Sequence, residues 1–175
     1  MAEFTKKLVV GEAHETDAFI GPLQNRQQFD KVKELFDDCK REGHAFAAGN
    51  GDIVPSPGFF IHPAIIDNPP NSSRIMLEEP FGPIVPCQPF SDIEEAIERA
   101  NSVNTGLGAC VWGADTDEAV RVGARLEAGS VFVNSYEKVH PDFHFCGHKE
   151  SGIGGEWGRL GCLAYCNAKV MHVYK

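Results

Sequence analysis

The stretch "GACVWGADTDEAVRVGARLEAGSVFVNS", residues 108–135, decides the fold of this chain. It begins and ends with short apolar runs, at 108–114 and 130–135, whose length and composition predict buried strands. Between them, residues 115–129 have helical periodicity and end at Gly129, a residue that commonly closes a helix. A strand, a helix and a second strand in this order predict two parallel strands joined by a crossover helix.

The same alternation extends toward the N-terminus. Residues 84–90, "IVPCQPF", predict a strand with edge-like prolines, and residues 74–79, "RIMLEE", predict another strand. Residues 91–103 predict a helix capped by Ser91, with Glu94 at the capping-box position. The apolar stripe of that helix consists of Ile93, Ala96, Ile97 and Ala100. We therefore expect an α/β fold with an open, twisted, mostly parallel sheet and helices on both of its faces.

The N-terminal part begins with a long predicted helix. Residues 21–43 carry Pro22 in a position suited to the first turn and Gly43 at the end. One face of the helix is apolar and contains Phe29, Val32, Leu35, Phe36 and Cys39. Residues 44–49 and 59–67 then predict two extended segments.

The C-terminal part is predicted to close with a helix over residues 154–168 and a strand over residues 169–174. Cys162 and Cys166 share one face of that helix and are expected in the core. None of the six cysteines has CxxC spacing, and in an intracellular chain they are expected to be reduced thiols that mostly fill the core. Cys110 is expected to be buried in its strand.

The composition is that of an ordinary globular protein. A length of 175 residues predicts one domain over 1–175, and 42% of the residues are hydrophobic. The net charge of −9, with acidic residues spread along the chain, argues against nucleic acid or an anionic membrane as the main partner. No apolar run approaches the length of a membrane span, and the cytoplasm is the expected location.

Six short motifs appear in one order along the chain. They are "GPLQNRQQFDKV", "LEEPFGPIVP", "ANSVNTGLGACVW", "LEAGSVFVN", "FCGHKESGIGGEWG" and "YCNAKVMHVY". Each resembles a motif of the aldehyde dehydrogenase superfamily, and together they cover essentially the whole chain. Two departures are Thr105, where the family has a tyrosine, and Gly155, where it has an arginine. The resemblance is to the C-terminal half of the family's catalytic domain only.

The resemblance also implies what this chain is expected to lack. In the family, the nucleophilic cysteine, the general-base glutamate and the glycine-rich turn of the cofactor domain all precede the point where this sequence begins. The segment "GIGGEWG" is no dinucleotide-binding fingerprint, because its last glycine is one place too late. No cofactor is therefore expected for this chain alone, and NAD only if a partner chain completes the site.

Four positions match residues that contact the dinucleotide in the family. Glu79 and Phe81 match those at the nicotinamide ribose and ring, and Gln28 and Lys31 match positions near the adenosine ribose. Here they are expected to be relics of one wall of that site. The alternative is that "EEPFGP" serves only the fold.

The stretch "VHPDFHFCGHKESG", residues 139–152, contains three histidines four apart. That spacing suits zinc on a helix, but Pro141 and the alternation of aromatic residues argue against a helix, so no metal is expected. In the family the matching loop lines the outer substrate funnel. His140, Asp142 and His144 are therefore candidates for acid–base catalysis. Cys146 is a candidate nucleophile. The alternative for His140, Asp142 and His144 is that they are solvated loop residues or contacts to a partner subunit. The alternative for Cys146 is a substitution that the loop tolerates.

Three functions remain open from the sequence. The first is a repurposed, non-redox enzyme of secondary metabolism that isomerises, cyclises, dehydrates or performs an aldol reaction on a small carbonyl or polyketide-like metabolite. The second is a non-catalytic remnant or interaction module. It would form a homodimer or higher oligomer through residues 169–174, or assemble with a full-length dehydrogenase. The third is residual NAD-dependent oxidation together with a partner chain.

Overall fold

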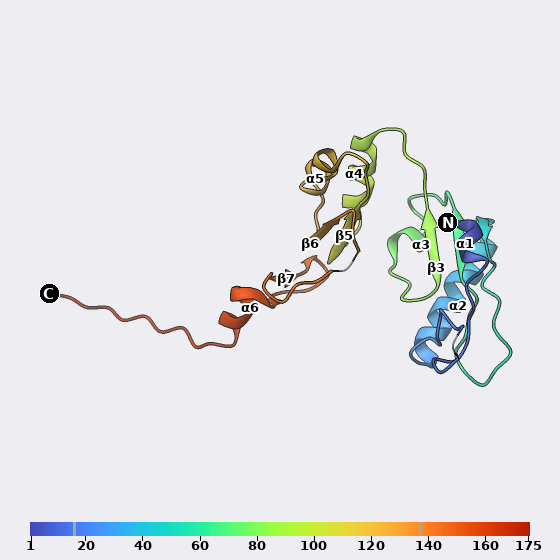
Figure 1. Ribbon diagram of the computed structural model, residues 1–175, viewed down its shortest axis with the longest axis horizontal. Coiled ribbons are helices and arrows are strands. Elements are labelled where there is room, and N and C mark those ends of the chain that lie inside the picture. The colour runs from blue at the N-terminus through green and yellow to red at the C-terminus, as the bar shows by residue number, and fades with distance from the viewer. Residues whose placement is uncertain (16, 137) are drawn as a thin grey trace. The chain divides into compact units, whose positions relative to one another are not determined.

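The computed structural model describes residues 1–15, 17–136 and 138–175. The chain divides into two compact units, Met1–Pro89 and Phe90–Lys175, and each is described by itself (Figure 1). Two compact units can belong to one structural domain, so the single domain expected from the length stays a prediction.

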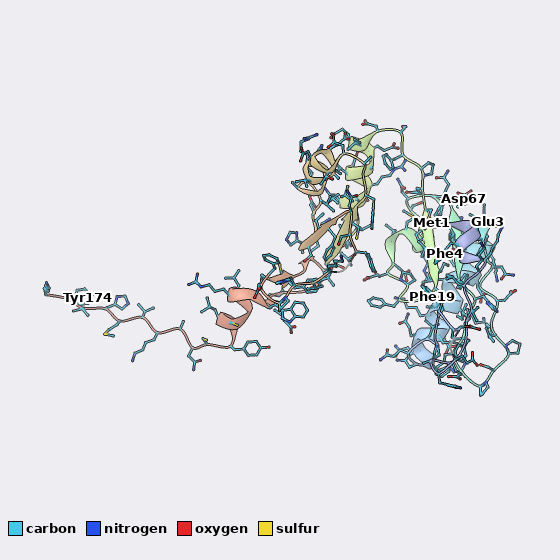
Figure 2. The ribbon with its side chains drawn as sticks, in the orientation of Figure 1. Met1, Glu3, Phe4, Phe19, Asp67 and Tyr174 are labelled. Carbon is cyan, nitrogen blue, oxygen red and sulfur yellow. The ribbon has the colours of Figure 1, made fainter. Side chains whose placement is uncertain are left out.

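The first unit is built on a three-stranded sheet of order β1–β2–β3. Strand β1 (Ala45–Ala48) pairs antiparallel with β2 (Ala64–Asp67), with an irregular register between Phe46 and Ala48. Strand β2 pairs parallel with β3 (Ile84–Cys87). Strand β3 confirms the strand predicted within residues 84–90 and shows that it runs parallel to β2. A short helix α1 (Ala2–Thr5) precedes this sheet, and Phe4 packs edge to face on Phe19 with ring centroids 6.1 Å apart (Figure 2).

Helix α2 (Arg26–Arg41) supplies most of the core of this unit. All five residues of its predicted apolar face are buried: Phe29, Val32, Leu35, Phe36 and Cys39. The predicted start was wrong, because Pro22 lies ahead of the helix and Asn25 is the N-cap. The Asn25 side chain accepts a hydrogen bond of 2.8 Å from the backbone N–H of Gln28, which satisfies one of the open donors of the first turn.

The predicted strand at 74–79 is wrong. Arg74–Leu77 form a one-turn helix, α3, whose Ile75 is buried in the core. The turn is held by Arg74, whose guanidinium donates to both carboxylate oxygens of Glu78, at 2.6 Å and 3.3 Å. Because Arg74 donates these bonds, the pKa of the Glu78 carboxyl lies below its ordinary value. Four residues are too few for either periodicity to show in the sequence.

The second unit contains the strand–helix–strand segment that the sequence predicted. Strands β5 (Gly108–Val111) and β6 (Ser130–Val133) are parallel and in register from end to end. Helix α5 (Thr116–Gly123) connects them and contacts both. Beyond the strand ends, the Asn134 side chain exchanges two hydrogen bonds of 2.9 Å with the backbone of Gly113. This amide therefore prolongs the ladder by one step where the backbone of Asn134 turns away, at φ 49°.

The helix boundaries of this unit differ from the prediction. Helix α4 (Ile93–Asn101) is capped by Asp92, not Ser91, and the Asp92 carboxylate accepts from Glu94 N. Helix α5 is capped by Asp115 and ends at Gly123, so Gly129 does not close it. Gly129 instead precedes β6 and passes so close to the carbonyl of Cys146 that no Cβ would fit. Cys110 is exposed, which corrects its assignment to the core.

Short elements complete the second unit. Strand β4 (Thr105–Gly106) pairs with β8 (His148–Lys149), β7 (Phe145–Cys146) pairs with β9 (Gly155–Glu156), and α6 (Gly158–Ala164) follows. The predicted α/β class is therefore confirmed, and in the described part of the chain the strands form four small sheets.

The C-terminal segment carries no regular structure within the chain. Residues 165–175 form no helix or strand, so the strand expected at 169–174 is absent from the single chain. Its apolar side chains are exposed, with Val173 at 78% and Tyr174 at 90% (Figure 2). Pairing of this segment with another subunit stays a prediction.

Candidate functional site

The stretch at residues 139–152, called the histidine loop below, is held in place by the segment that follows it. Gly158 N donates to the carbonyl of Pro141 at 2.9 Å, and Phe143 N donates to His140 O at 3.0 Å. Gly158 has φ 58°, and a Cβ there would lie 2.8 Å from Asp142 O. Only glycine combines that backbone conformation with such a close approach. The loop is thus fixed against the start of α6.

His140 and Asp142 form a pair at the exposed side of the loop. His140 Nδ1 lies 3.4 Å from Asp142 Oδ2 and 3.4 Å from Asp142 N. A neutral His140 accepts from the backbone N–H, and a protonated one donates to the carboxylate. The side chains are 58% and 82% exposed, so water screens the pair and its strength is small. The ring of Phe143 packs on His140 with centroids 5.4 Å apart and limits its motion.

His144 is half-buried and its tautomer follows from its neighbour. Its Nδ1 lies 3.4 Å from the carbonyl oxygen of Trp157. A carbonyl only accepts, so a neutral His144 that makes this contact has its proton on Nδ1 and a lone pair on Nε2. Nε2 lies over Gly155, where an added Cβ would be only 2.5 Å away. The position at which the family has an arginine therefore holds the one residue that leaves room for this imidazole.

Two of the four candidate residues line one hollow. A cavity of about 340 Å³ lies between the loop and β6, and His140 and His144 are both in its wall. Lys138 also lines it, a third nitrogen group that sequence reasoning missed because the lysine precedes the histidine stretch. Phe143 and Phe145 give the wall an apolar part. The hollow thus brings together the imidazoles of His144 and His140 and the ammonium group of Lys138. Such groups can move protons to and from a bound carbonyl compound.

Cys146 belongs to a different surface. It lines a second hollow of about 340 Å³, together with Ser151, Glu156 and Tyr165. The Cβ of Cys146 would lie 2.7 Å from a Cβ placed at Gly155, so thiol and His144 ring are neighbours over the same glycine. Cys146 nevertheless does not line the hollow of His140 and His144, and the catalytic roles of all four residues stay predictions.

The positions that match the cofactor wall lie in the first unit. Gln28 Nε2 donates to Pro80 O at 2.6 Å, and Lys31 Nζ donates to Glu79 O at 3.1 Å. These two side chains tie helix α2 to the loop of Glu79 and Phe81. Phe81 has φ 46° and is 71% exposed, and Glu79 is exposed as well.

A dinucleotide therefore fits these residues only in part. The Glu79 carboxylate and the Phe81 ring are available to a ribose and a flat ring, whereas Gln28 and Lys31 each use a donor on the loop backbone. Gln28 and Lys31 thus hold the backbone of the loop that carries Glu79 and Phe81. This favours the alternative that "EEPFGP" is needed for the fold. NAD binding by this chain stays a prediction.

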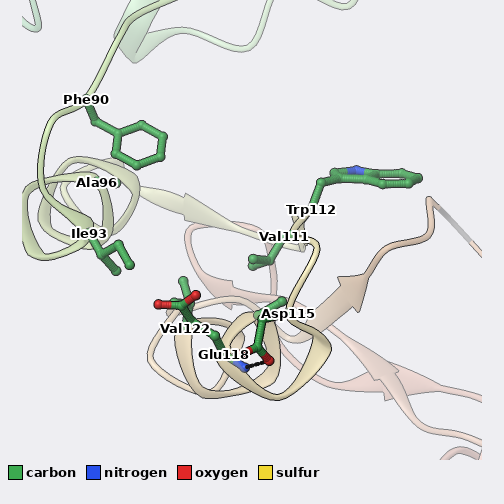
Figure 3. A pocket seen from close by; sticks show the side chains of 10 residues that line it. Phe90, Ile93, Ala96, Val111, Trp112, Asp115, Glu118 and Val122 are labelled. Atoms are coloured by element: carbon green, nitrogen blue, oxygen red, sulfur yellow. Dashed lines mark hydrogen bonds between the residues drawn. The ribbon is translucent and has the colours of Figure 1, made fainter.

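Three further features concern metal binding, membrane insertion and a third hollow. Within the described ranges, no three His, Cys, Asp or Glu side chains lie close enough together to hold a metal ion. In the same part of the chain, no helix is both long and apolar enough to cross a membrane. A third hollow of about 140 Å³, lined by Phe90, Ile93 and Trp112, lies between α4, α5 and the end of β5 (Figure 3). Its side chains come from two helices and the end of a strand, so no single stretch of sequence predicts this hollow.

Comparisons with known proteins agree with the sequence motifs. The chain is 42% identical to the putative aldehyde dehydrogenase FUS7 of Gibberella moniliformis, over 89% of this chain and 34% of that protein. It is 36% identical to the retinaldehyde dehydrogenase 3 of Mus musculus, over 98% of this chain and 33% of that protein.

Solved structures give the same result. The NAD⁺ complex of betaine aldehyde dehydrogenase from Staphylococcus aureus superposes with a TM-score of 0.87 at 32% identity, over 94% of this chain and 33% of that one. The NAD⁺ complex of an aldehyde dehydrogenase from Bacillus cereus gives 0.86 at 33% identity, over 91% of this chain and 32% of that one. The chain thus spans about a third of the length of these relatives. Since the profile of the aldehyde dehydrogenase family also matches residues 1–171, the chain belongs to the aldehyde dehydrogenase family.

Proposed function

We propose that this chain is a non-redox, acid–base enzyme of the cytoplasm that acts on a small carbonyl or polyketide-like metabolite, and that it is not competent alone for NAD-dependent aldehyde oxidation. The observation that carries the proposal is the hollow that brings His140, His144 and Lys138 together. Isomerisation, cyclisation, dehydration and aldol reactions share one first step, removal of a proton next to a carbonyl group. That step needs a base and an acid, and it needs no cofactor.

In this scheme His144 is the base. Its Nε2 has a lone pair because Nδ1 donates to Trp157 O, and it accepts the proton from the carbon next to the carbonyl. The electron pair left on that carbon forms the enolate. His140, protonated and held beside Asp142, donates its proton to the enolate oxygen. Lys138 adds a positive charge near the developing oxyanion. Reprotonation at a different carbon, or attack on a second carbonyl, completes the reaction.

Exchange of the α-proton for deuterium tests this scheme without knowledge of the product. A panel of small ketones, aldehydes and β-keto esters in D2O is followed by proton NMR, with wild type, His140→Ala and His144→Ala. We expect the wild type to catalyse exchange on at least one class and each variant to lose about 100-fold or more of it, the range typical for loss of a general acid or base.

His148→Ala is the matched control. His148 belongs to the same stretch, is exposed and lies outside the hollow wall, so its removal should leave exchange unchanged. Equal exchange by wild type and His144→Ala on every class, or no exchange by the wild type, would overturn the proposal.

A second candidate function is that of an interaction module, favoured by the C-terminal segment. Val170, Met171, Val173 and Tyr174 are between 76% and 90% exposed in the single chain. An extended apolar segment of this kind pairs readily with a strand edge, either of a second copy or of a full-length dehydrogenase. Light scattering at micromolar concentration distinguishes this function: we expect a dimer or larger, reverting to monomer in His172→Pro, which removes a backbone donor from the segment. A wild-type monomer would contradict it.

Residual oxidation is the third candidate, and it requires the rest of a dehydrogenase from another chain. Incubation with NAD and aldehydes should give no absorbance at the NADH band for this chain alone. A rise with this chain alone would refute the non-redox proposal. A rise only after a full-length relative has been added, beyond that relative's own rate, would favour assembly over independent catalysis.

A further inference from the structure

We propose that Cys162 and Cys166 form a peroxide-sensitive dithiol pair that closes to an intrachain disulfide at the end of α6. Nothing in the proposed acid–base function requires this pair, and it stands on separate observations. The sequence suggested that both residues fill the core, whereas both are exposed, which corrects that expectation.

The two cysteines lie four residues apart where α6 ends: Cys162 is in its last turn, and Cys166 follows the C-cap residue Tyr165. Residues four apart in a helix have Cβ atoms about 5–6 Å from each other. The helix is packed at Gly161, which is buried and where a Cβ would lie 2.6 Å from the backbone of Glu156. The helix is therefore fixed to β9 through Gly161, whereas Cys162 and Cys166 are exposed.

The two residues are already in polar contact. The Cys166 thiol donates to the carbonyl oxygen of Cys162 at 3.5 Å, which holds its sulfur over the turn that begins at Cys162. Backbone donors of Tyr165 and Cys166 bond to Cys162 O and Leu163 O, so the chain is still curled at this point although α6 ends at Ala164. A disulfide needs the Cβ atoms about 1–2 Å closer than two helical residues place them.

That approach is open here because the turn is unburied. Every residue from Cys162 to Cys166 is exposed, and no regular element follows Ala164. The last turn can tighten without displacing packed neighbours, as it could not in mid-helix. The disulfide would enclose Leu163, Ala164 and Tyr165, directly ahead of the C-terminal segment.

The oxidant is a hydroperoxide, and the reaction balances in two steps. The thiolate of one cysteine attacks the O–O bond, an S–O bond forms, and the leaving hydroxide takes a proton to become water. The second thiol loses its proton and attacks the sulfenic sulfur. The S–S bond forms, the S–O bond breaks, and a second hydroxide leaves as water. Two thiols are oxidised and one hydroperoxide is reduced.

A single tryptic peptide reports the outcome. Cleavage after Arg159 and Lys169 releases residues 160–169, which contain these two cysteines and none of the other four. The full chain is reduced, treated with hydrogen peroxide, alkylated with N-ethylmaleimide and digested. We expect this peptide to be lighter by two hydrogens and unalkylated, and the number of alkylated thiols to fall from six to four. Dithiothreitol should restore all six.

Cysteine variants distinguish disulfide formation between Cys162 and Cys166 from non-specific oxidation of exposed thiols. In Cys162→Ser and in Cys166→Ser the remaining thiol should stop at the sulfenic acid, which dimedone traps, with no disulfide. Cys110→Ser removes another exposed cysteine and should still lose two thiols. The proposal is overturned if peptide 160–169 stays doubly alkylated after peroxide treatment. It is equally overturned if the disulfide joins two chains, or if it joins either cysteine to Cys146.

Discussion

At the scale of single residues, the candidate site depends on two glycines. Gly158 lets the loop backbone pass beside the start of α6, and Gly155 leaves the space in which the His144 imidazole lies. Neither glycine belongs to the histidine stretch, so the sequence could nominate His144 as a base but could not show what positions it. The proton on Nδ1 follows from Trp157 O, another residue outside that stretch.

Gly155→Ala tests the positioning of His144 without removing any functional group. Its new Cβ would lie 2.5 Å from Nε2 and 2.7 Å from the Cβ of Cys146, so the imidazole must move. We expect α-proton exchange to fall by about 100-fold, the cost of misplacing a catalytic group by roughly 1 Å. Proton NMR in D2O measures the change.

Gly108→Ala is the control for this prediction. It makes the same substitution in the same unit, at a position whose new Cβ would approach Phe132 no closer than 3.9 Å. An unchanged exchange rate in Gly155→Ala, or an equal loss in Gly108→Ala, would show that the space over Gly155 is not what orients His144.

One ion pair should give stability a measurable pH dependence. Arg125 donates to both carboxylate oxygens of Glu94, and the pKa of Glu94 lies below its ordinary value of 4.5 for this reason. The pair therefore stabilises the fold above pH 4.5, and the contribution is lost as the pH falls through the lowered pKa. Arg125→Gln should lower the urea midpoint at neutral pH, and the difference should shrink as the pH falls through the lowered pKa of Glu94. Arg121→Gln, in the last turn of α5 just ahead of Arg125, is the matched control, and a pH-independent difference would contradict the assignment.

At the scale of elements, helical and strand periodicity in the sequence predicted most of the helices and strands. The five apolar positions of α2 are all buried, and strands β3, β5 and β6 lie where the apolar runs are. Errors remained in boundaries, element type and burial. The cap of α4 shifted by one residue because Ser91 and Asp92 are equally good caps and only the backbone conformation selects between them. The segment at 74–79 was predicted as a strand because four residues are too few for helical periodicity to show. Cys162 and Cys166 were expected in the core, but whether a residue is covered depends on tertiary contacts.

Asn25→Ala tests the corrected start of α2. The side-chain oxygen of Asn25 accepts from Gln28 N, and its loss leaves that donor to water. We expect the free energy of unfolding to fall by about 1 kcal/mol, the usual effect of losing a helix N-cap. Urea denaturation measures it, with Gln27→Ala, an exposed position in the first turn, as control. A loss no greater than the control's would place the start of the helix elsewhere.

At the scale of the whole molecule, the chain holds two compact units and about a third of its relatives' length. The family could be predicted from the sequence alone, because the six motifs and their order are properties of the sequence. The hollow could not, because its wall combines β6, Lys138 and the histidine loop, and the sequence does not show which distant segments meet. Lys138 was missed because it precedes the histidine stretch, and only the structure shows that Cys146 lines a different hollow.

The most direct test of the acid–base account is a crystal structure of this chain with an enolate analogue such as acetylacetone. We expect density in the hollow, with a ligand oxygen within hydrogen-bonding distance of His140 and the central carbon of the ligand facing His144 Nε2. A ligand bound instead against Glu79 and Phe81, or a hollow that stays empty at concentrations where NMR detects binding, would contradict it.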